Sequence, residues 1–189
     1  MDKTIGLPLP LDRKIYLYDQ IEQKVIEKVS KSIISINEND RYLEKLYQIH
    51  GITYNPAPIE LYIDSYGGMV YQTFGLISLI ETSVTPVHTI CTGTAMSCGI
   101  LLLIAGHKRF CYKRSTIMLH SISTFFEGQV QDIKEELAET ERLQEIVTSL
   151  VVEKTSIPLK TVKAVETGKK DWYMTPNQAK KFKIIDEII

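Results

Sequence analysis

Two stretches of the sequence share one pattern: an apolar run of strand length, a turn of small residues, and an apolar run with helical spacing. The first stretch covers residues 59–81 and turns at Gly67-Gly68. The second covers residues 87–105 and turns at Thr92–Met96. Strands joined by a helix pair in parallel, because the helix returns the chain to the end of the sheet where the first strand began. The pattern therefore predicts an α/β fold with a largely parallel sheet.

Apolar periodicity predicts further elements on either side of these stretches. We expect strands over Ile15–Tyr18, Ile59–Ile63, Val87–Cys91, Phe110–Tyr112, Thr116–His120 and Ile184-Ile185. We expect helices over Val70–Glu81, Ser97–Ala105 and Gln129–Val152, and two more that begin near Pro158 and Pro176. Thr175 and Gln178 predict a capping box at the last of these helices.

The segment between residues 19 and 51 is predicted to form two helices. Apolar residues recur every four positions from Ile21 to Ile33, which indicates a first helix with Asp19 as its N-cap. The polar run Asn37–Asp40 predicts a break. The second helix is expected to end at Gly51, because a glycine suits the position after a helix C-terminus.

The composition is that of one globular domain over residues 1–189, with 44% hydrophobic and 24% charged residues. Residues 1–13 hold two prolines and no periodicity, so we expect a mobile N-terminal arm there. A formal charge of −1 argues against nucleic-acid binding, which needs clustered positive charge. The longest strictly apolar run, Ile100–Ala105, is far shorter than the roughly 20 residues of a membrane span. Three cysteines in no paired pattern and the lack of a signal-peptide pattern predict a reducing, cytoplasmic compartment.

The turn before the second apolar helix is a candidate site for a nucleophile. Ser97 stands at its tip with Ala95 and Gly99 two residues to either side, a pattern similar to G-x-S-x-G with alanine in first place. A sharp turn of this kind exposes one side chain at a helix N-terminus, where the helix dipole favours a developing oxyanion. The backbone N–H of Cys98 would face the same space. Small residues at a strand–helix junction also suit simple packing, so the pattern alone leaves both interpretations open.

A serine nucleophile needs a base, and the base needs a carboxylate that orients it. His120 is the preferred base because it ends a predicted strand, where functional residues of α/β folds gather. The other histidines are His50, His88 and His107. Asp171 is a candidate acid, since the Trp-Tyr pair that follows it would partly bury it. The residues by themselves do not separate Asp171 from Asp132 or Asp186.

Six segments, taken in order, resemble the proteolytic subunit of the Clp protease family. They are LYIDSYGG at Leu61–Gly68, TICTGTAMSCGILLLIAG at Thr89–Gly106, Met118–His120, Gly128–Asp132, Asp171–Thr175 and Ile185-Asp186. The resemblance covers about residues 59–189. It implies a serine endopeptidase that forms an acyl-enzyme, with Ser97 as nucleophile, His120 as general base and Asp171 as orienting acid. The implied oxyanion hole consists of the backbone N–H groups of Gly68 and Cys98.

The same resemblance implies the fold and the assembly. The fold would be the ββα spiral of Clp peptidases and crotonases, with a projecting helix-and-strand handle over residues 121–152. The handle would join subunits into a homo-oligomer, a heptameric ring or a double heptamer around a proteolytic chamber. An AAA+ unfoldase would deliver unfolded polypeptides. No metal or other cofactor is implied, and ATP would be used only by the unfoldase. Neither nucleic acid nor membrane is expected as a partner.

The sequence departs from the family's pattern at several positions. Tyr66 replaces a proline before the glycine pair, and Ser121-Ile122 replaces the Gln-Pro that follows the active-site histidine. Lys169-Lys170 replaces an acid–arginine pair linked to ring–ring contact. Glu60 replaces an aromatic residue of the unfoldase docking pocket, whereas Tyr62 is retained. The segment before Ile59 is about a dozen residues longer than the family's.

The residues leave several competing interpretations open. Cys98 is a second candidate nucleophile with His120, although a turn that exposes Ser97 would direct Cys98 inward. A zinc site built from Cys91, Cys98, Cys111, His88 and His107 would lack the usual paired spacing. At the level of the whole chain, the competing functions are a catalytically silent scaffold subunit, a crotonase-type acyl-CoA enzyme and a Ser–Lys peptidase.

Overall fold

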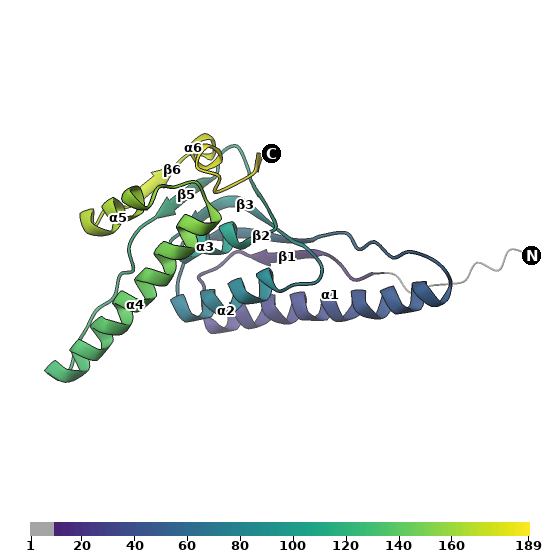
Figure 1. The fold of residues 1–189 in the computed structure, drawn as a ribbon, viewed down its shortest axis with the longest axis horizontal. Helices are drawn as coiled ribbons and strands as arrows, with labels where there is room; N and C mark the ends of the chain where they lie inside the picture. The colour runs from purple at the N-terminus through teal and green to yellow at the C-terminus, as the bar shows by residue number, and fades with distance from the viewer. Residues whose placement is uncertain (1–9) are drawn as a thin grey trace, which may run out of the picture.

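The computed structural model describes residues 10–189, which form a seven-stranded sheet with six helices (Figure 1). The strands are β1 (Lys14–Leu17), β2 (Ile59–Ser65), β3 (Val87–Met96), β4 (Lys108–Cys111), β5 (Thr116–Leu119), β6 (Trp172–Met174) and β7 (Glu187–Ile188). The helices are α1 (Gln23–Ile49), α2 (Val70–Glu81), α3 (Cys98–Ala105), α4 (Val130–Lys154), α5 (Leu159–Gly168) and α6 (Pro176–Lys181). The N-terminal arm expected over residues 1–13 lies outside the described residues as far as residue 9.

The sheet runs in the order β1-β2-β3-β4-β7, and all of these neighbours are parallel. β5 pairs in parallel with the second half of β3, and β6 pairs antiparallel with β5. The predicted α/β fold with a largely parallel sheet is therefore confirmed. The turn predicted at Thr92–Met96 is wrong, because β3 continues through these residues to pair Thr94–Met96 with β5.

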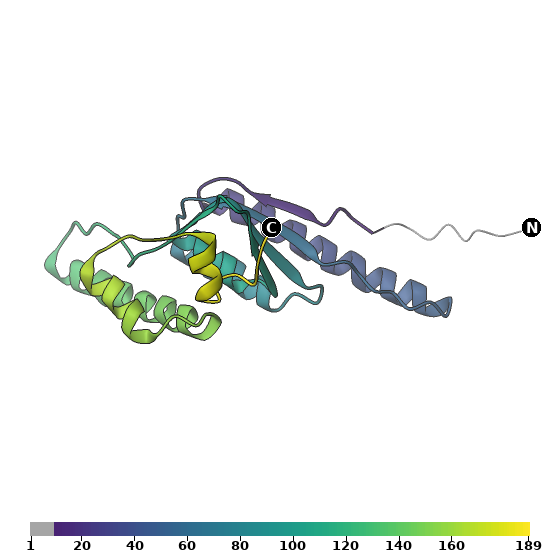
Figure 2. The same cartoon turned by 90° about the horizontal axis from the view of Figure 1, so that it is seen from above.

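The helices α1, α2 and α3 cover one side of this sheet, and α4 packs outside α3. α1 and α2 lie side by side along the sheet, and α3 lies between the sheet and α4 (Figures 1 and 2). Every residue of α3 is buried, which is why its sequence is apolar all round. Within residues 10–189, no helix is both long and apolar enough to cross a membrane.

The buried residues of α4 lie in its second half, while its first half projects away (Figure 1). The apolar stripe predicted for this helix is therefore divided. Leu143, Val147 and Val151 are buried, whereas Leu137 is exposed. In the first half, Glu139 accepts the Tyr71 hydroxyl of α2 at 2.6 Å. The segment 121–129 that precedes α4 contains no strand in the single chain. The handle over residues 121–152 stays a prediction.

Of two predictions near the C-terminus, a capping box and a strand, one is confirmed and one is wrong. The capping box of α6 is confirmed: the Thr175 N–H donates to Gln178 Oε1 at 2.9 Å, and the Gln178 N–H donates to Thr175 Oγ1 at 3.4 Å. The strand predicted at Ile184-Ile185 is wrong. These two side chains are buried in the core, and the chain joins the sheet only afterwards, as β7 beside β4.

α1 is one continuous helix, so the break predicted at Asn37–Asp40 is wrong. The Asp19 cap is also wrong, because Glu22 occupies the N-cap position and makes no side-chain cap bond. Asn37 and Asp40 are three residues apart and both lie on the buried face. Their side chains point inward, where partners from distant segments satisfy them. The predicted helix end is confirmed, with Gly51 at a φ of +70°.

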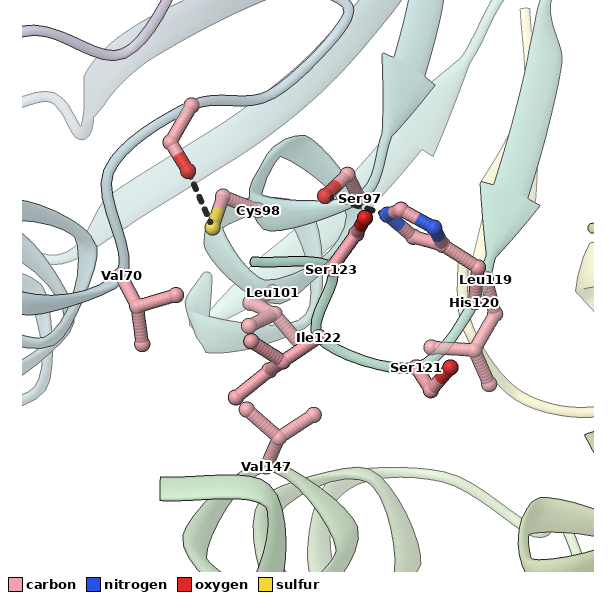
Figure 3. A pocket seen from close by; sticks show the side chains of 11 residues that line it. Val70, Ser97, Cys98, Leu101, Leu119, His120, Ser121, Ile122, Ser123 and Val147 are labelled. Carbon is pink, nitrogen blue, oxygen red and sulfur yellow. Dashed lines mark hydrogen bonds between the residues drawn. The ribbon is translucent and has the colours of Figure 1, made fainter. Parts of the chain in front are cut away.

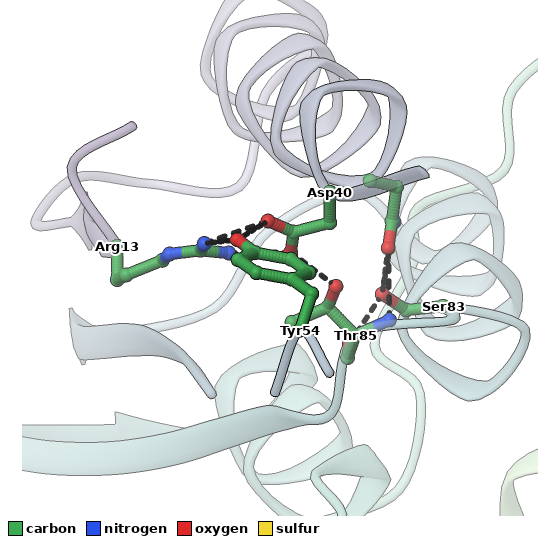
Figure 4. Close-up of polar contacts among 6 residues, drawn as sticks. Arg13, Asp40, Tyr54, Ser83 and Thr85 are labelled. Carbon is green, nitrogen blue, oxygen red and sulfur yellow. Dashed lines mark hydrogen bonds and ion pairs between the residues drawn. The ribbon is translucent and has the colours of Figure 1, made fainter. Parts of the chain in front are cut away.

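Asp40 is the centre of a buried polar network (Figure 4). Its carboxylate accepts two bonds from the Arg13 guanidinium, at 2.5 and 2.6 Å, and one each from the Tyr54 hydroxyl at 2.7 Å and the Thr85 hydroxyl at 2.5 Å. Asn37 accepts the Thr85 N–H at 3.0 Å. Burial opposes the charge on Asp40, yet the bonds from Arg13, Thr85 and Tyr54 outweigh it and lower its pKa. The network joins the entry to β1, the long helix, the loop after it and the entry to β3.

We expect Asp40→Ala to lower the free energy of unfolding at pH 7 by about 3–5 kcal/mol, because it leaves the Arg13 charge buried and unpaired. Urea unfolding followed by circular dichroism measures this. The folded-state pKa of Asp40 lies below its unfolded value, so its contribution is complete above the unfolded pKa, about 4. It is lost as pH falls through the lower folded pKa. The difference between wild type and Asp40→Ala should therefore shrink in acid.

The matched control is Lys31→Ala, which breaks the exposed Lys31–Glu27 pair on the same helix. It should cost far less than Asp40→Ala, because water screens an exposed ion pair. Equal losses in the two variants would contradict a special role for the buried network.

Candidate active site

Ser97 lies where β3 passes directly into α3. Its backbone has a φ of 53° and a ψ of −121°, a conformation that non-glycine residues rarely adopt. Its N–H donates to the carbonyl of Met118 on β5 at 3.0 Å, which ties the turn to the neighbouring strand. The sharp, strained turn that the sequence pattern predicts is therefore present, and it lifts the serine side chain out of the sheet.

His120 comes directly after β5, the strand beside the end of β3. Its Nε2 atom lies 2.7 Å from Ser97 Oγ, and Figure 3 shows the two side chains facing each other. The distance is that of a hydrogen bond. The parallel pairing of β3 with β5 brings these residues together, since both strands end at the same edge of the sheet.

Asp171 reaches the same place through the antiparallel pair β5–β6. Leu119 pairs with Trp172, so the next position of that register sets His120 opposite Asp171. The Asp171 Oδ1 atom lies 3.7 Å from His120 Nδ1, which is longer than a hydrogen bond. The expected aromatic cover is wrong: the Asp171 side chain is 53% exposed, because Trp172 turns away to pack on Phe182.

The other candidate residues lie elsewhere. Asp186 forms an ion pair with Arg109 at 2.6 Å, beside β4. His107 accepts the Val87 N–H at the opposite end of β3. Among the four histidines and the three aspartates considered, the structure brings His120 and Asp171 to Ser97.

The glycine pair lies against the serine turn. Gly67 has a φ of +106°, and a Cβ atom there would stand 2.6 Å from Ser97 Cβ and 3.1 Å from the Cys98 nitrogen. Gly68 has a φ of +152°, and a Cβ on it would overlap the backbone of Ile21. Only glycine fits both positions. Within residues 10–189, the backbone N–H groups of Gly68 and Cys98 have no hydrogen-bond acceptor.

Residues outside the predicted triad and oxyanion hole hold this glycine turn. Ile21 bridges it, donating its N–H to the Gly67 carbonyl and accepting the Met69 N–H, both at 2.8 Å. The Ser65 hydroxyl donates to the Asp19 carbonyl at 2.7 Å and accepts the Gly67 N–H at 3.2 Å. Nothing in the local sequence signals Ile21, because its role depends on the tertiary position of the segment before α1.

A cavity of about 80 Å³ opens beside Ser97 and His120 (Figure 3). Ser97, Cys98 and Gly68 form its polar side. The apolar side is formed by Val70, Leu101, Leu119, Ile122 and Val147. A small apolar group next to a serine hydroxyl would fit here.

Cys98 faces inward, as the turn geometry predicts. Its thiol is buried and donates to the Gly68 carbonyl at 3.2 Å, and burial raises its pKa. A raised pKa keeps the thiol protonated, which argues against a thiolate nucleophile. In the part of the chain that the structure describes, no three His, Cys, Asp or Glu side chains are grouped as metal ligands.

Comparison with known proteins adds independent information. Residues 4–189 match the sequence model of a family described as Clp protease. A relative in Deinococcus radiodurans, named ATP-dependent Clp protease proteolytic subunit, is 33% identical over 133 residues. This alignment covers 69% of the present chain and 64% of the relative.

We expect Gly67→Ala to lower the free energy of unfolding by about 1–3 kcal/mol, because the side chain would meet Ser97 in a backbone conformation that favours glycine. Gly75→Ala is the matched control. Gly75 lies inside α2, where a Cβ meets no atom within 4 Å. That change should stabilise the protein by up to about 1 kcal/mol. Urea unfolding of both variants tests the prediction, and a neutral Gly67→Ala would contradict it.

Proposed function

Because the chain belongs to the Clp protease family, we propose that it is a serine endopeptidase that cleaves peptide bonds through an acyl-enzyme. The observation that carries the proposal is the 2.7 Å contact between Ser97 Oγ and His120 Nε2, at a turn that exposes the hydroxyl. A scaffold subunit or a crotonase-type enzyme would not require this serine–histidine contact.

In the proposed reaction, Ser97 Oγ attacks the peptide carbonyl carbon while His120 Nε2 takes the hydroxyl proton. The carbonyl oxygen becomes an oxyanion, which accepts hydrogen bonds from the N–H groups of Gly68 and Cys98. His120 then gives its proton to the leaving amine, and the peptide bond breaks. Water, deprotonated by His120, attacks the acyl-serine, and release of the acid restores Ser97. The reaction needs no metal or other cofactor.

Asp171 is proposed to orient His120 and to stabilise its protonated form. The 3.7 Å separation must close by about 0.9 Å to give a hydrogen bond. Hydrogen bonds of catalytic groups are often long in unliganded enzymes and tighten on binding. The Asp171 side chain is exposed and lies just before the short strand β6, so it has room for this movement.

The substrate is proposed to be an unfolded polypeptide bound as an added strand beside the Gly67-Gly68 edge. Backbone hydrogen bonding of this kind is tolerant of sequence. The 80 Å³ cavity beside Ser97 would take a small apolar side chain next to the cleaved bond.

We further propose that copies of the chain assemble into heptameric rings through the projecting half of α4. An AAA+ unfoldase would dock on the outer face of the sheet and alone would use ATP. Tyr16 and Tyr62 stack there at 5.3 Å, with Glu60 bonded to the Tyr62 hydroxyl. Three free, buried cysteines suit the proposed cytoplasmic location.

Covalent labelling by a fluorophosphonate tests the proposed nucleophile. We expect wild type to be labelled and Ser97→Ala to lose the label, because phosphonylation needs an activated hydroxyl. Intact-protein mass spectrometry followed by peptide mapping locates the label. Ser32→Ala, on the exposed surface of α1, is the control and should label like wild type. An unlabelled wild-type protein would instead support a scaffold subunit or a crotonase-type enzyme.

Peptidase kinetics test the other two roles. His120→Ala should lower kcat on the order of 10⁶-fold, as should Ser97→Ala. Asp171→Asn should cost roughly 10⁴-fold, because it leaves nucleophile and base in place. Equal losses in all three folded variants would mean that Asp171 is not the orienting acid. Retained activity in His120→Ala would point to a lysine base instead.

A further inference from the structure

The segment that follows His120 is not held by regular secondary structure. Residues 121–128 belong to no helix or strand, yet Ser121, Ile122 and Ser123 line the cavity beside Ser97 (Figure 3). Within residues 10–189, the backbone of this segment makes one hydrogen bond. The Ile122 N–H donates to the side-chain oxygen of Gln144 at 2.7 Å.

Gln144 is itself fixed by a second contact. It lies on the half of α4 that packs on the body, and its amide nitrogen donates to Glu166 Oε1 of α5 at 3.1 Å. Glu166 also accepts the Thr148 hydroxyl and the Lys163 ammonium, the latter at 2.9 Å. The Glu166 side chain is only 12% exposed, and Thr148 is buried. This arrangement sets which way the Gln144 amide points, with its oxygen toward Ile122.

We infer that Gln144 is a positioning residue for His120, acting through the Ile122 N–H, and that Glu166 orients Gln144. His120 is held on one side by β5 and is followed, two residues later, by this single tether to α4. Without the Gln144 oxygen, the part-buried Ile122 N–H loses its hydrogen-bond partner. Within residues 10–189, segment 121–128 then has no other backbone hydrogen bond to hold it. The His120 ring and the Ile122 wall of the cavity would then shift together. This inference rests on the proposed function of Ser97 and His120.

The experiment measures the second-order rate of Ser97 labelling by a small fluorophosphonate, which reports the Ser97–His120 geometry with little contribution from substrate binding. We expect Gln144→Met, which removes the acceptor at similar length, to slow labelling about 10–100-fold. The matched control is Gln48→Met. Gln48 is exposed near the end of α1, on a different helix from Gln144, so this variant should label at the wild-type rate.

The exchange variant Gln144→Glu/Glu166→Gln separates positioning from packing. In this variant the carboxylate introduced at position 144 can accept the Ile122 N–H, and the amide introduced at position 166 can donate to the same carboxylate. The net charge of the protein is unchanged. We expect labelling within about threefold of wild type, since a charged acceptor bonds a backbone N–H well. Thermal unfolding is measured for each variant, so that labelling is compared well below the transition. If Gln144→Met does not fold, Gln144→Ala removes the same acceptor.

The outcomes distinguish the two proposals. Labelling of Gln144→Met at the wild-type rate would overturn the positioning role while leaving the proposed function intact. Slow labelling of the exchange variant, equal to that of Gln144→Met, would also overturn it, because the loss would then come from packing of α4 on α5. Absence of labelling in wild type would instead overturn the proposed function itself.

Discussion

The close approach of two strand–helix turns is the constraint on which the site depends. The turns after β2 and β3 meet so tightly that a single added carbon on Gly67 would overlap Ser97. Parallel strands end at the same edge of a sheet, so their turns gather there. Here the crowding places two backbone N–H groups, which have no acceptor within residues 10–189, beside a strained serine. A residue with a side chain in the first turn would separate the two groups that the proposed oxyanion hole needs.

Support for this contact comes from segments far apart in the chain. Ile21 bridges the glycine turn from the segment before α1, and β5 holds the serine turn through Met118. The Asp40 network then fixes the entry to β1 against the entry to β3. The Ser97 turn thus lies at the ordered centre of the sheet. The histidine and aspartate stand on its less regular side, where β5 and β6 are short and Asp171 is exposed.

Local sequence patterns predicted most of the helices and strands correctly. They failed where residues distant in the sequence decide the local structure. α2 begins and ends as predicted, because its apolar stripe is a property of the segment itself. The polar run Asn37–Asp40 predicts a break because Asn and Asp favour caps and turns. They stay helical because Arg13, Ser83 and Thr85 reach them from other parts of the fold. Residues 92–96 resemble a turn in sequence, yet they form a strand because β5 offers an edge to pair with.

The sequence by itself determined the fold class, the serine at the tip of a strand–helix turn and the glycine pair, because these depend on short-range periodicity and backbone freedom. It also favoured His120, from its place at a strand end. Only the tertiary structure placed Asp171, among the three candidate aspartates, 3.7 Å from His120, since this proximity rests on the antiparallel register of β5 and β6. The Gln144 contact to Ile122 likewise joins residues 22 positions apart. No local pattern encodes such a contact, because it exists only once α4 has packed against the body.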